Sequence, residues 1–258
     1  TAAVGTTPPG SAQVPYGWAA VPNRTSAGGV TTTFDAADRP TSTGFAADLD
    51  GRLTAIPARG GAAAKSLAYD ALGRLVSATV AGVTRTYAYD PLDRLVTISE
   101  GGNPVVRIRY VGQTASVAQL LDGAWTVTRN IATDATGTPL ADWAAGGSGW
   151  RRYLSNGHGD LVATAAANGT ISASLRLDPW GVPLRAVPAG YPSFGFQGSL
   201  TDRTTTLVYA RARWYDPVLA TFTSEDPLAG DIADPPSRHL YAYGAGDPVD
   251  RIDPNVPA

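Results

Sequence analysis

Tyr69-Asp70-Ala71-Leu72-Gly73-Arg74-Leu75 returns twenty residues later as Tyr89-Asp90-Pro91-Leu92-Asp93-Arg94-Leu95. Two shorter versions precede these copies, at residues 34–39 and 48–53, and in all four an aspartate is followed four positions later by an arginine. The four aspartates lie 13, 22 and 20 residues apart. A pattern repeated at such a period is typical of an architecture built from one recurring supersecondary unit.

Each repeat predicts a β-hairpin. Alternating runs such as residues 85–89 and 95–99 are rich in β-branched and aromatic residues, which favours half-buried strands. Between the runs, the aspartate can accept a hydrogen bond from the N–H two residues on, and Gly51, Gly73 or Asp93 can adopt a positive φ. One hairpin is not stable alone, so successive hairpins must pair edge to edge into a long sheet.

The bulk composition favours a turn-rich β protein. Of the 258 residues, 43% are apolar and only 16% are charged, with 29 glycines and 20 prolines. The net charge of −2 gives no electrostatic footprint for nucleic acid, and no stretch approaches the ~18 consecutive apolar residues of a membrane span. The absence of cysteine excludes disulfides. We assign no function to Lys65, the only lysine.

The repeat resembles the YD repeat of RHS proteins, teneurins and the C component of insecticidal toxin complexes. The C-terminal region is similar to the RHS-associated core, and the resemblance spans residues 34–258. The matching segments, in the family's order, are Tyr153–Ala163, Leu177–Pro183, Phe196–Gly198, Leu207–Pro217, Phe222–Leu228, Tyr241–Tyr243 and Ile252–Pro254.

The fold class expected is all-β, with stacked antiparallel hairpins forming part of a spiral shell that an RHS-core plug closes. Residues 1–30 are expected to be a low-complexity linker or a strip pinned onto the shell. Residues 31–149 are expected to form the hairpin sheet and residues 150–258 the core domain.

In the family, this core often acts as an aspartic autoprotease that releases a C-terminal toxin inside the shell. When the family's catalytic residues are carried over by position, the resemblance implies catalytic roles for Asp226, Asp253 and Arg213. Two carboxylates a few ångströms apart share one proton, so one can activate water while the other donates to the amide carbonyl. The arginine thirteen residues before Asp226 would hold one carboxylate ionised.

The sequence departs from the family where the cut is expected. Val256 stands where the family has Gly and Pro257 where it has Leu, which places the cleavage site at Pro257 and Ala258. Three alternatives remain open: a slowed or inactive protease, an altered tail, or a chain that is the cleaved product.

Other candidates carry weaker arguments. Arg211 is an alternative to Arg213, because residues two apart in a strand face the same side. His239 lies beside the core motifs and is a secondary candidate. His158 and His239 are 81 residues apart, so we expect no metal site, and no motif points to a cofactor.

The function expected is encapsulation and self-cleaving release of a C-terminal toxin or effector by a secreted or cell-surface bacterial protein. Its partners would be its own cargo, the upstream shell and a delivery machinery, with no nucleic acid and no membrane span. The alternative is a non-enzymatic adhesion or glycan-binding scaffold with an inactive core.

Overall fold

The computed structural model describes residues 14–19, 23–228, 230–231, 233 and 235–251. Its main element is a 13-stranded sheet in which every strand pairs with the next one along the chain. All of these pairings are antiparallel. The strands are β4 (Ala46–Ala47), β5 (Leu53–Ile56), β6 (Lys65–Tyr69), β7 (Leu75–Val80), β8 (Val83–Tyr89), β9 (Leu95–Glu100), β10 (Asn103–Tyr110), β11 (Val117–Leu121), β12 (Val127–Thr133), β13 (Pro139–Trp143), β14 (Arg151–Ser155), β15 (Leu161–Ala166) and β16 (Ile171–Ser174).

The turn between β6 and β7 shows why the repeat folds as it does. Asp70 Oδ1 accepts hydrogen bonds from the N–H groups of Leu72 and Arg74, both at 3.0 Å, and its Oδ2 accepts one from Arg74 Nε at 2.8 Å. Gly73 takes the positive φ of 81° that closes the turn. Asp48 and Asp90 make the same three contacts in their own turns. The hairpin repeat expected from the sequence is therefore confirmed.

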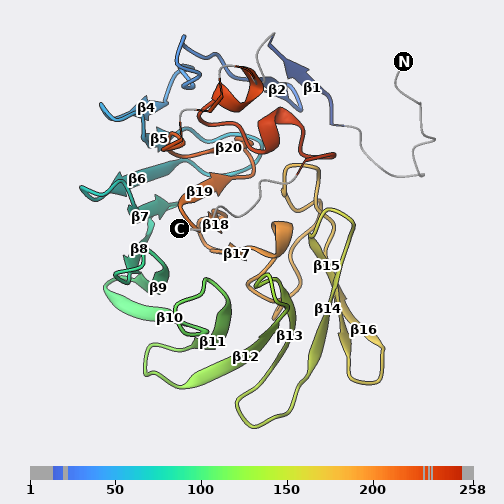
Figure 1. Cartoon of the computed structure of the whole chain (residues 1–258). Helices are drawn as coiled ribbons and strands as arrows, with labels where there is room; N and C mark the ends of the chain where they lie inside the picture. The colour runs from blue at the N-terminus through green and yellow to red at the C-terminus, as the bar shows by residue number, and fades with distance from the viewer. Residues whose placement is uncertain (1–13, 20–22, 229, 232, 234, 252–258) are drawn as a thin grey trace, which may run out of the picture.

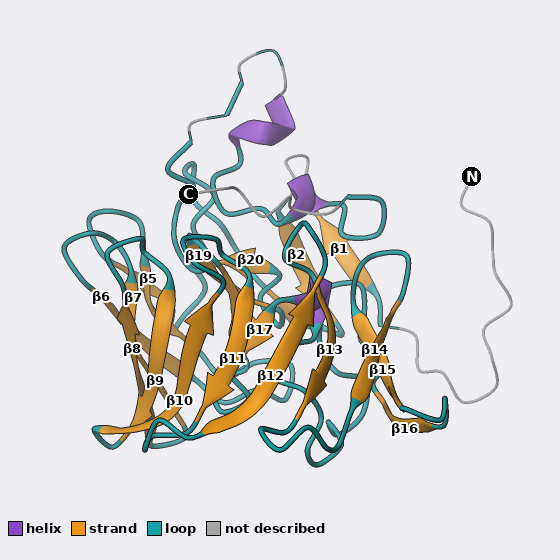
Figure 2. Cartoon of the chain, turned by 60° about the horizontal axis from the view of Figure 1, so that its bottom comes forward, coloured by secondary structure: helices purple, strands orange, loops and turns teal. Residues whose placement is uncertain are grey.

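The sheet curls into an arc. In Figure 1, β4 to β16 follow one another around the left, bottom and right of the molecule, and Figure 2 shows their strands side by side from below. A second sheet, of β17 (Leu200–Thr201), β18 (Val208–Ala210), β19 (Arg213–Asp216) and β20 (Thr221–Phe222), lies on the concave side of this arc. The arc is open, because β4 and β16 are its two edges.

The core lies between the arc and this second sheet. Inward side chains of the arc, such as Leu95 and Tyr87, share one buried cluster with Leu207 and Trp214 of the C-terminal region. The opposite face of the second sheet packs a smaller cluster that includes Tyr215. The C-terminal region thus fills the hollow of the hairpin sheet, and the all-β fold of stacked hairpins with a core plug is confirmed.

A buried ion pair joins the two sheets. Lys65 Nζ on β6 lies 2.9 Å from Asp216 Oδ2 on β19, and both side chains are at most 2% exposed. The ion pair gives Lys65, the only lysine, a structural role, because its charge lies inside the core and must be matched there.

Two further features bear on the expected domains. The chain's early part forms a small sheet of β1 (Tyr16–Trp18), β2 (Arg24–Ala27) and β3 (Val30–Thr31). The large sheet continues without a break from β13 through β14 to β16, across residues 149 and 150. The domain division expected between these two residues stays a prediction. Within the described residues, no helix is long and apolar enough to span a membrane.

Candidate functional site

A cavity of about 420 Å³ lies between the repeat turns and the second sheet. We call it the aromatic cavity, because Tyr69, Tyr89, Tyr110, Tyr209 and Trp214 line it. Three leucines also line the cavity: Leu72 and Leu92 from the repeat turns, and Leu228 from the Asp-Pro-Leu segment. Leu72 is 73% exposed, Leu92 44% and Leu228 63%. Such a cavity can accept an apolar segment of polypeptide.

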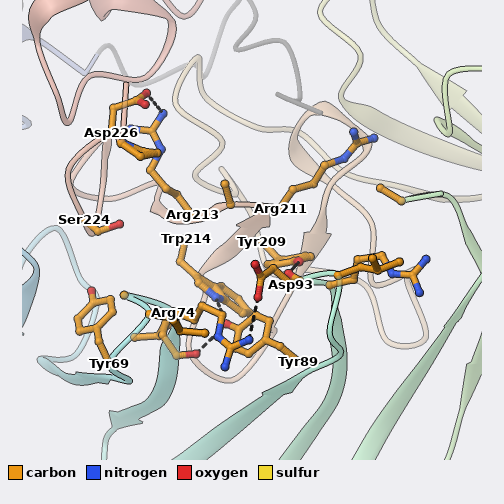
Figure 3. Close-up of a pocket in the computed structure, with 18 of the residues that line it drawn as sticks. Tyr69, Arg74, Tyr89, Asp93, Tyr209, Arg211, Arg213, Trp214, Ser224 and Asp226 are labelled. Atoms are coloured by element: carbon orange, nitrogen blue, oxygen red, sulfur yellow. Dashed lines mark hydrogen bonds and ion pairs between the residues drawn. The ribbon is translucent and has the colours of Figure 1, made fainter. Parts of the chain in front are cut away.

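Arg213 and Asp226 stand together at one end of this cavity, as Figure 3 shows. Arg213 Nη2 lies 2.6 Å from Asp226 Oδ2. Arg213 Nη1 donates to the carbonyl oxygen of Leu240 at 3.1 Å, and the N–H of Asp226 donates to the same oxygen at 2.8 Å. The guanidinium also lies 3.6 Å from the ring centre of Phe222. Arg213 is therefore held on several sides.

The Asp226 side chain is held in one orientation and remains partly exposed to solvent. Its Oδ1 accepts a hydrogen bond from the N–H of Leu228 at 2.9 Å, the contact expected for an Asp-Pro turn. Its side chain is 27% exposed, whereas that of Arg213 is 9% exposed. The carboxylate therefore lines the aromatic cavity, with Oδ2 in the ion pair with Arg213 and Oδ1 accepting the backbone N–H of Leu228.

The segment before Asp226 is fixed to the repeat turn at residues 48–53 and to Tyr69, which begins the next repeat. Thr223 accepts hydrogen bonds at its carbonyl oxygen from the N–H of Leu53 (2.8 Å) and the hydroxyl of Tyr69 (3.0 Å). Glu225 Oε1 accepts one from the Tyr241 hydroxyl at 3.0 Å. The same hydroxyl also donates to the carbonyl oxygen of Gly51, in the repeat turn at residues 48–53, at 2.6 Å. The repeat array thereby sets the position of the carboxylate.

The structure brings two of the expected catalytic residues together. The third, Asp253, and the expected cleavage site at Pro257 and Ala258 lie outside the described residues. Arg251, the last described residue, has its carbonyl oxygen 3.4 Å from His158 Nε2. The geometry therefore speaks to Arg213 and Asp226 alone.

Arg211 does not share a strand with Arg213, contrary to the expectation. It lies in the two-residue turn between β18 and β19, with a φ of 58°, so the two side chains are not related by strand alternation. In Figure 3, its side chain extends away from the Arg213–Asp226 ion pair. Arg211 forms no hydrogen bond or ion pair within the described part of the chain.

Neither histidine contacts this ion pair within the described residues. His239 is buried; its Nε2 lies 2.7 Å from Asn23 Oδ1, and its Nδ1 accepts from the N–H of Tyr241 at 3.2 Å. Burial lowers the pKa of His239 below its usual 6.5, so the neutral ring is favoured. His158 contacts Asp160 at 3.2 Å. Among the residues described, no group of three or more side chains suits a metal ion.

Some residues of the site carry no signal in the sequence. The carbonyl oxygen of Leu240 joins Arg213 to Asp226, and backbone atoms leave no trace in residue types. Trp214 forms the cavity wall and donates from Nε1 to the Tyr89 hydroxyl at 2.9 Å. Its partner is 125 positions away, which only the fold could reveal.

An open sheet of aspartate-turn hairpins with a C-terminal core in its hollow defines a β-shell protein. The chain belongs to the teneurin YD-shell family, whose model matches residues 19–249. It is 28% identical over 237 residues to the tRNA nuclease WapA of Bacillus subtilis, which is 90% of this chain and 9% of that protein. It is 30% identical over 103 residues to Teneurin-m of Drosophila melanogaster, 39% of this chain and 4% of that protein.

Two solved toxin-complex structures resemble the fold. The TcdB2-TccC3-TEV crystal structure aligns with a TM-score of 0.66 at 18% identity, over 94% of this chain and 13% of that chain. The Photorhabdus luminescens Tc holotoxin pore aligns with a TM-score of 0.61 at 16% identity, over 87% of this chain and 12% of that chain. The chain therefore spans about a tenth of the length of the long proteins it matches over most of its sequence.

Proposed function

We propose that this chain forms the closing segment and plug of a β-shell that encloses a C-terminal polypeptide cargo and releases it by self-cleavage. The family membership and the core filling the arc support the shell role. The relatives named as tRNA nucleases and as parts of Tc toxins support a toxic enzyme as the cargo. The upstream shell and a delivery machinery would be the other partners, at the cell surface or after secretion.

The observation that carries the proteolytic part is the ion pair between Arg213 and Asp226 at the end of the aromatic cavity. Structural ion pairs are common, but this one combines three features. It is held by a shared backbone oxygen, it leaves the carboxylate partly exposed, and it adjoins a cavity of about 420 Å³. A partly exposed carboxylate beside a cleft, held by an arginine, is an arrangement that can serve as a catalytic group.

Asp226 and Asp253 would act as an aspartic pair. The ionised carboxylate takes a proton from a water molecule, whose oxygen bonds to the carbonyl carbon of the scissile peptide. The protonated carboxyl donates to the carbonyl oxygen, and collapse of the tetrahedral intermediate breaks the C–N bond with a proton passing to the leaving amine. Because the substrate is the chain's own tail, its effective concentration is high without a separate binding step.

The test joins a small folded reporter after Ala258 and follows the intact mass of the freshly made protein. We expect a cut near Pro257 that disappears in Asp226→Asn and in Asp253→Asn. Asparagine retains the oxygen that accepts the N–H of Leu228, so Asp226→Asn removes the charge and keeps the turn.

Asp247→Asn is the matched control, because Asp247 also precedes proline and accepts a backbone N–H at 3.2 Å, from Asp250. This variant should cut at the parent rate. A second variant, Val256→Gly with Pro257→Leu, restores the family residues and should cut at least as fast as the parent. If both the parent and this double variant stay intact, the proteolytic proposal is wrong and the scaffold alternative gains.

A further inference from the structure

The peptide unit between Leu240 and Tyr241 contacts both the candidate site and a buried histidine. Its carbonyl oxygen, that of Leu240, accepts from Arg213 Nη1 at 3.1 Å and from the N–H of Asp226 at 2.8 Å. Its N–H, that of Tyr241, donates to His239 Nδ1 at 3.2 Å. Because a peptide unit is planar, a contact that fixes its N–H also fixes the direction of its carbonyl group. His239 therefore helps to hold the oxygen that joins Arg213 to Asp226.

The other side of the His239 ring faces Asn23, which directly precedes β2 in the early part of the chain. His239 Nε2 lies 2.7 Å from Asn23 Oδ1, and Asn23 Nδ2 donates to Asp38 Oδ1 at 2.6 Å. Asn23 is 3% exposed and His239 is 7% exposed, so water has little access to either side chain. One polar chain thus runs from Asp38 through Asn23 and His239 to the N–H of Tyr241.

The hydrogen-bond roles along this chain have one consistent assignment. A carboxylate only accepts, so the Asn23 amide turns its NH2 group to Asp38 and its oxygen to His239. His239 Nε2 must then carry the proton and donate, which leaves Nδ1 to accept the N–H of Tyr241. A doubly protonated ring has no acceptor for that N–H. Burial lowers the pKa of His239 and favours the neutral ring, although the charge of Asp38 acts in the opposite direction.

Asn23 is a fixed point, because the strand that follows it is anchored to the core region. The next residue, Arg24, is 6% exposed and lies over the rings of Tyr16 and Trp180, at 5.5 and 5.0 Å from their centres. Arg24 Nη2 also donates to the carbonyl oxygen of Val218. The small β1–β3 sheet is therefore held against the core region, and Asn23 is held with it.

From these contacts we infer that His239 is a positioning residue for the arginine–aspartate pair, and that Asn23 sets the orientation of its ring. An imidazole can turn about its Cβ–Cγ bond. The contact with Asn23 Oδ1 keeps Nδ1 directed at the N–H of Tyr241. Two residues 216 positions apart thereby act on one carbonyl group. The expected effect on cleavage rests on the proposed proteolysis, whereas the effect on the backbone does not.

The test measures amide hydrogen exchange in the 258-residue chain and the rate of cleavage in the chain carrying the reporter. Asn23→Ala removes the contact that orients the ring, so the Asp226 N–H, which donates to Leu240, should exchange about tenfold faster. The N–H of Leu53, which donates to Thr223, is the internal reference and should keep its rate. The same variant should slow cleavage by about tenfold, because a small displacement of a reacting group has such an effect.

Variants of His239 separate positioning from a general effect on folding. His239→Leu removes the acceptor for Tyr241 and should reproduce both effects of Asn23→Ala, so either variant alone can decide. His239→Asn keeps an oxygen that can accept an N–H two residues on, and this contact does not need Asn23. Asn23→Ala added to His239→Asn should therefore change neither rate by more than about twofold, whereas independent structural effects would add.

Tyr16→Phe is the matched control. It removes a different hydrogen bond between the β1–β3 sheet and the core region, the one that the Tyr16 hydroxyl donates to Asp178 at 3.1 Å. This variant should exchange and cut as the parent does. A tenfold change here would show that any loosening of the sheet disturbs the site, which would overturn the specific role of Asn23 and His239.

The two measurements distinguish this inference from the proposed proteolysis. Equal acceleration of the Asp226 and Leu53 amides in Asn23→Ala would contradict the inference, and so would no acceleration of either. An equal effect of Asn23→Ala with and without His239→Asn would contradict it as well. If the parent stays uncut, the proteolysis fails and the exchange rates still decide the role of His239. If the parent cuts but the Asp226 amide keeps its rate in Asn23→Ala, only this inference fails.

Discussion

The guanidinium carbon of Arg74 lies 5.1 Å from the centre of the Tyr89 ring, and the two residues belong to consecutive repeats. Arg74 Nε closes the turn of its own repeat at Asp70, while Nη1 reaches Asp93 in the next turn at 2.8 Å. One side chain thus stabilises a turn and couples it to its neighbour. Arg52 over Tyr69 and Arg94 over Tyr110 repeat the stacking. This coupling explains how short hairpins join into one cooperative sheet.

Replacing Arg74 by lysine should therefore destabilise the fold although the charge is kept. An ammonium cannot make the fork of contacts to two turns or lie flat on the Tyr89 ring. We expect a loss of about 1–2 kcal/mol in the free energy of unfolding, measured by urea titration. Arg152→Lys on β14, an exposed arginine, is the control and should change stability by less than about 0.5 kcal/mol. Equal losses would contradict the role given to Arg74.

Gly51→Ala should cost more stability than Gly73→Ala. Both glycines have a positive φ, so each alanine is strained by about 1 kcal/mol. At Gly51 a Cβ would also come within 2.1 Å of Glu225 Oε1 and 2.6 Å of the Tyr241 hydroxyl, whereas at Gly73 the nearest atom, of Arg52, is 3.6 Å away. Overpacking adds about 1–3 kcal/mol. The unfolding midpoints of the two variants measure the difference. Equal losses of stability would contradict the close packing of Gly51 against Glu225 and Tyr241.

The buried ion pair of Lys65 and Asp216 should show strong coupling. Lys65→Met leaves an unmatched buried carboxylate and should cost about 3–5 kcal/mol. In the double variant Lys65→Met with Asp216→Asn, most of that loss should return, since asparagine can still accept the N–H groups of Val218 and Leu219. A double-mutant cycle of unfolding free energies measures the coupling. Additive losses would show that the two charges do not depend on each other.

Acidification should destabilise the fold through the buried imidazole of His239. Burial lowers its folded-state pKa below 6.5, so the folded protein binds fewer protons than the unfolded chain at mildly acidic pH. The stability gained from the neutral ring is complete above about pH 6.5 and is lost as pH falls through the folded-state pKa. His239→Gln should flatten the fall of the thermal midpoint below pH 6.5. An unchanged fall in this variant would contradict the role given to His239.

The repeat was predictable from the sequence, and the site only partly so. Asp70, Gly73 and Arg74 act within one turn, so their spacing fixes their contacts. Arg213 and Asp226 could be paired only through the family resemblance, because a turn and strand β20 lie between them. The same non-local packing hid the partner of Lys65.

Trp125 shows a different limit. Its turn follows the same hydrogen-bond pattern as the repeats, but the tryptophan in the glycine position removes the recognisable signature. Arg211 shows how a two-residue turn breaks strand alternation, which the residue types around it did not indicate. Local rules predicted local geometry, and they failed where tertiary contacts or strain set the conformation.

Intact mass spectrometry of the chain carrying a reporter after Ala258 tests the central proposal most directly. If Asp226 and Asp253 form a working protease, the fresh protein shows two masses from a cut near Pro257, and Asp226→Asn shows one uncut mass. A cut of equal extent in the parent and in Asp226→Asn would contradict the account, because the carboxylate beside Arg213 would then take no part in cleavage.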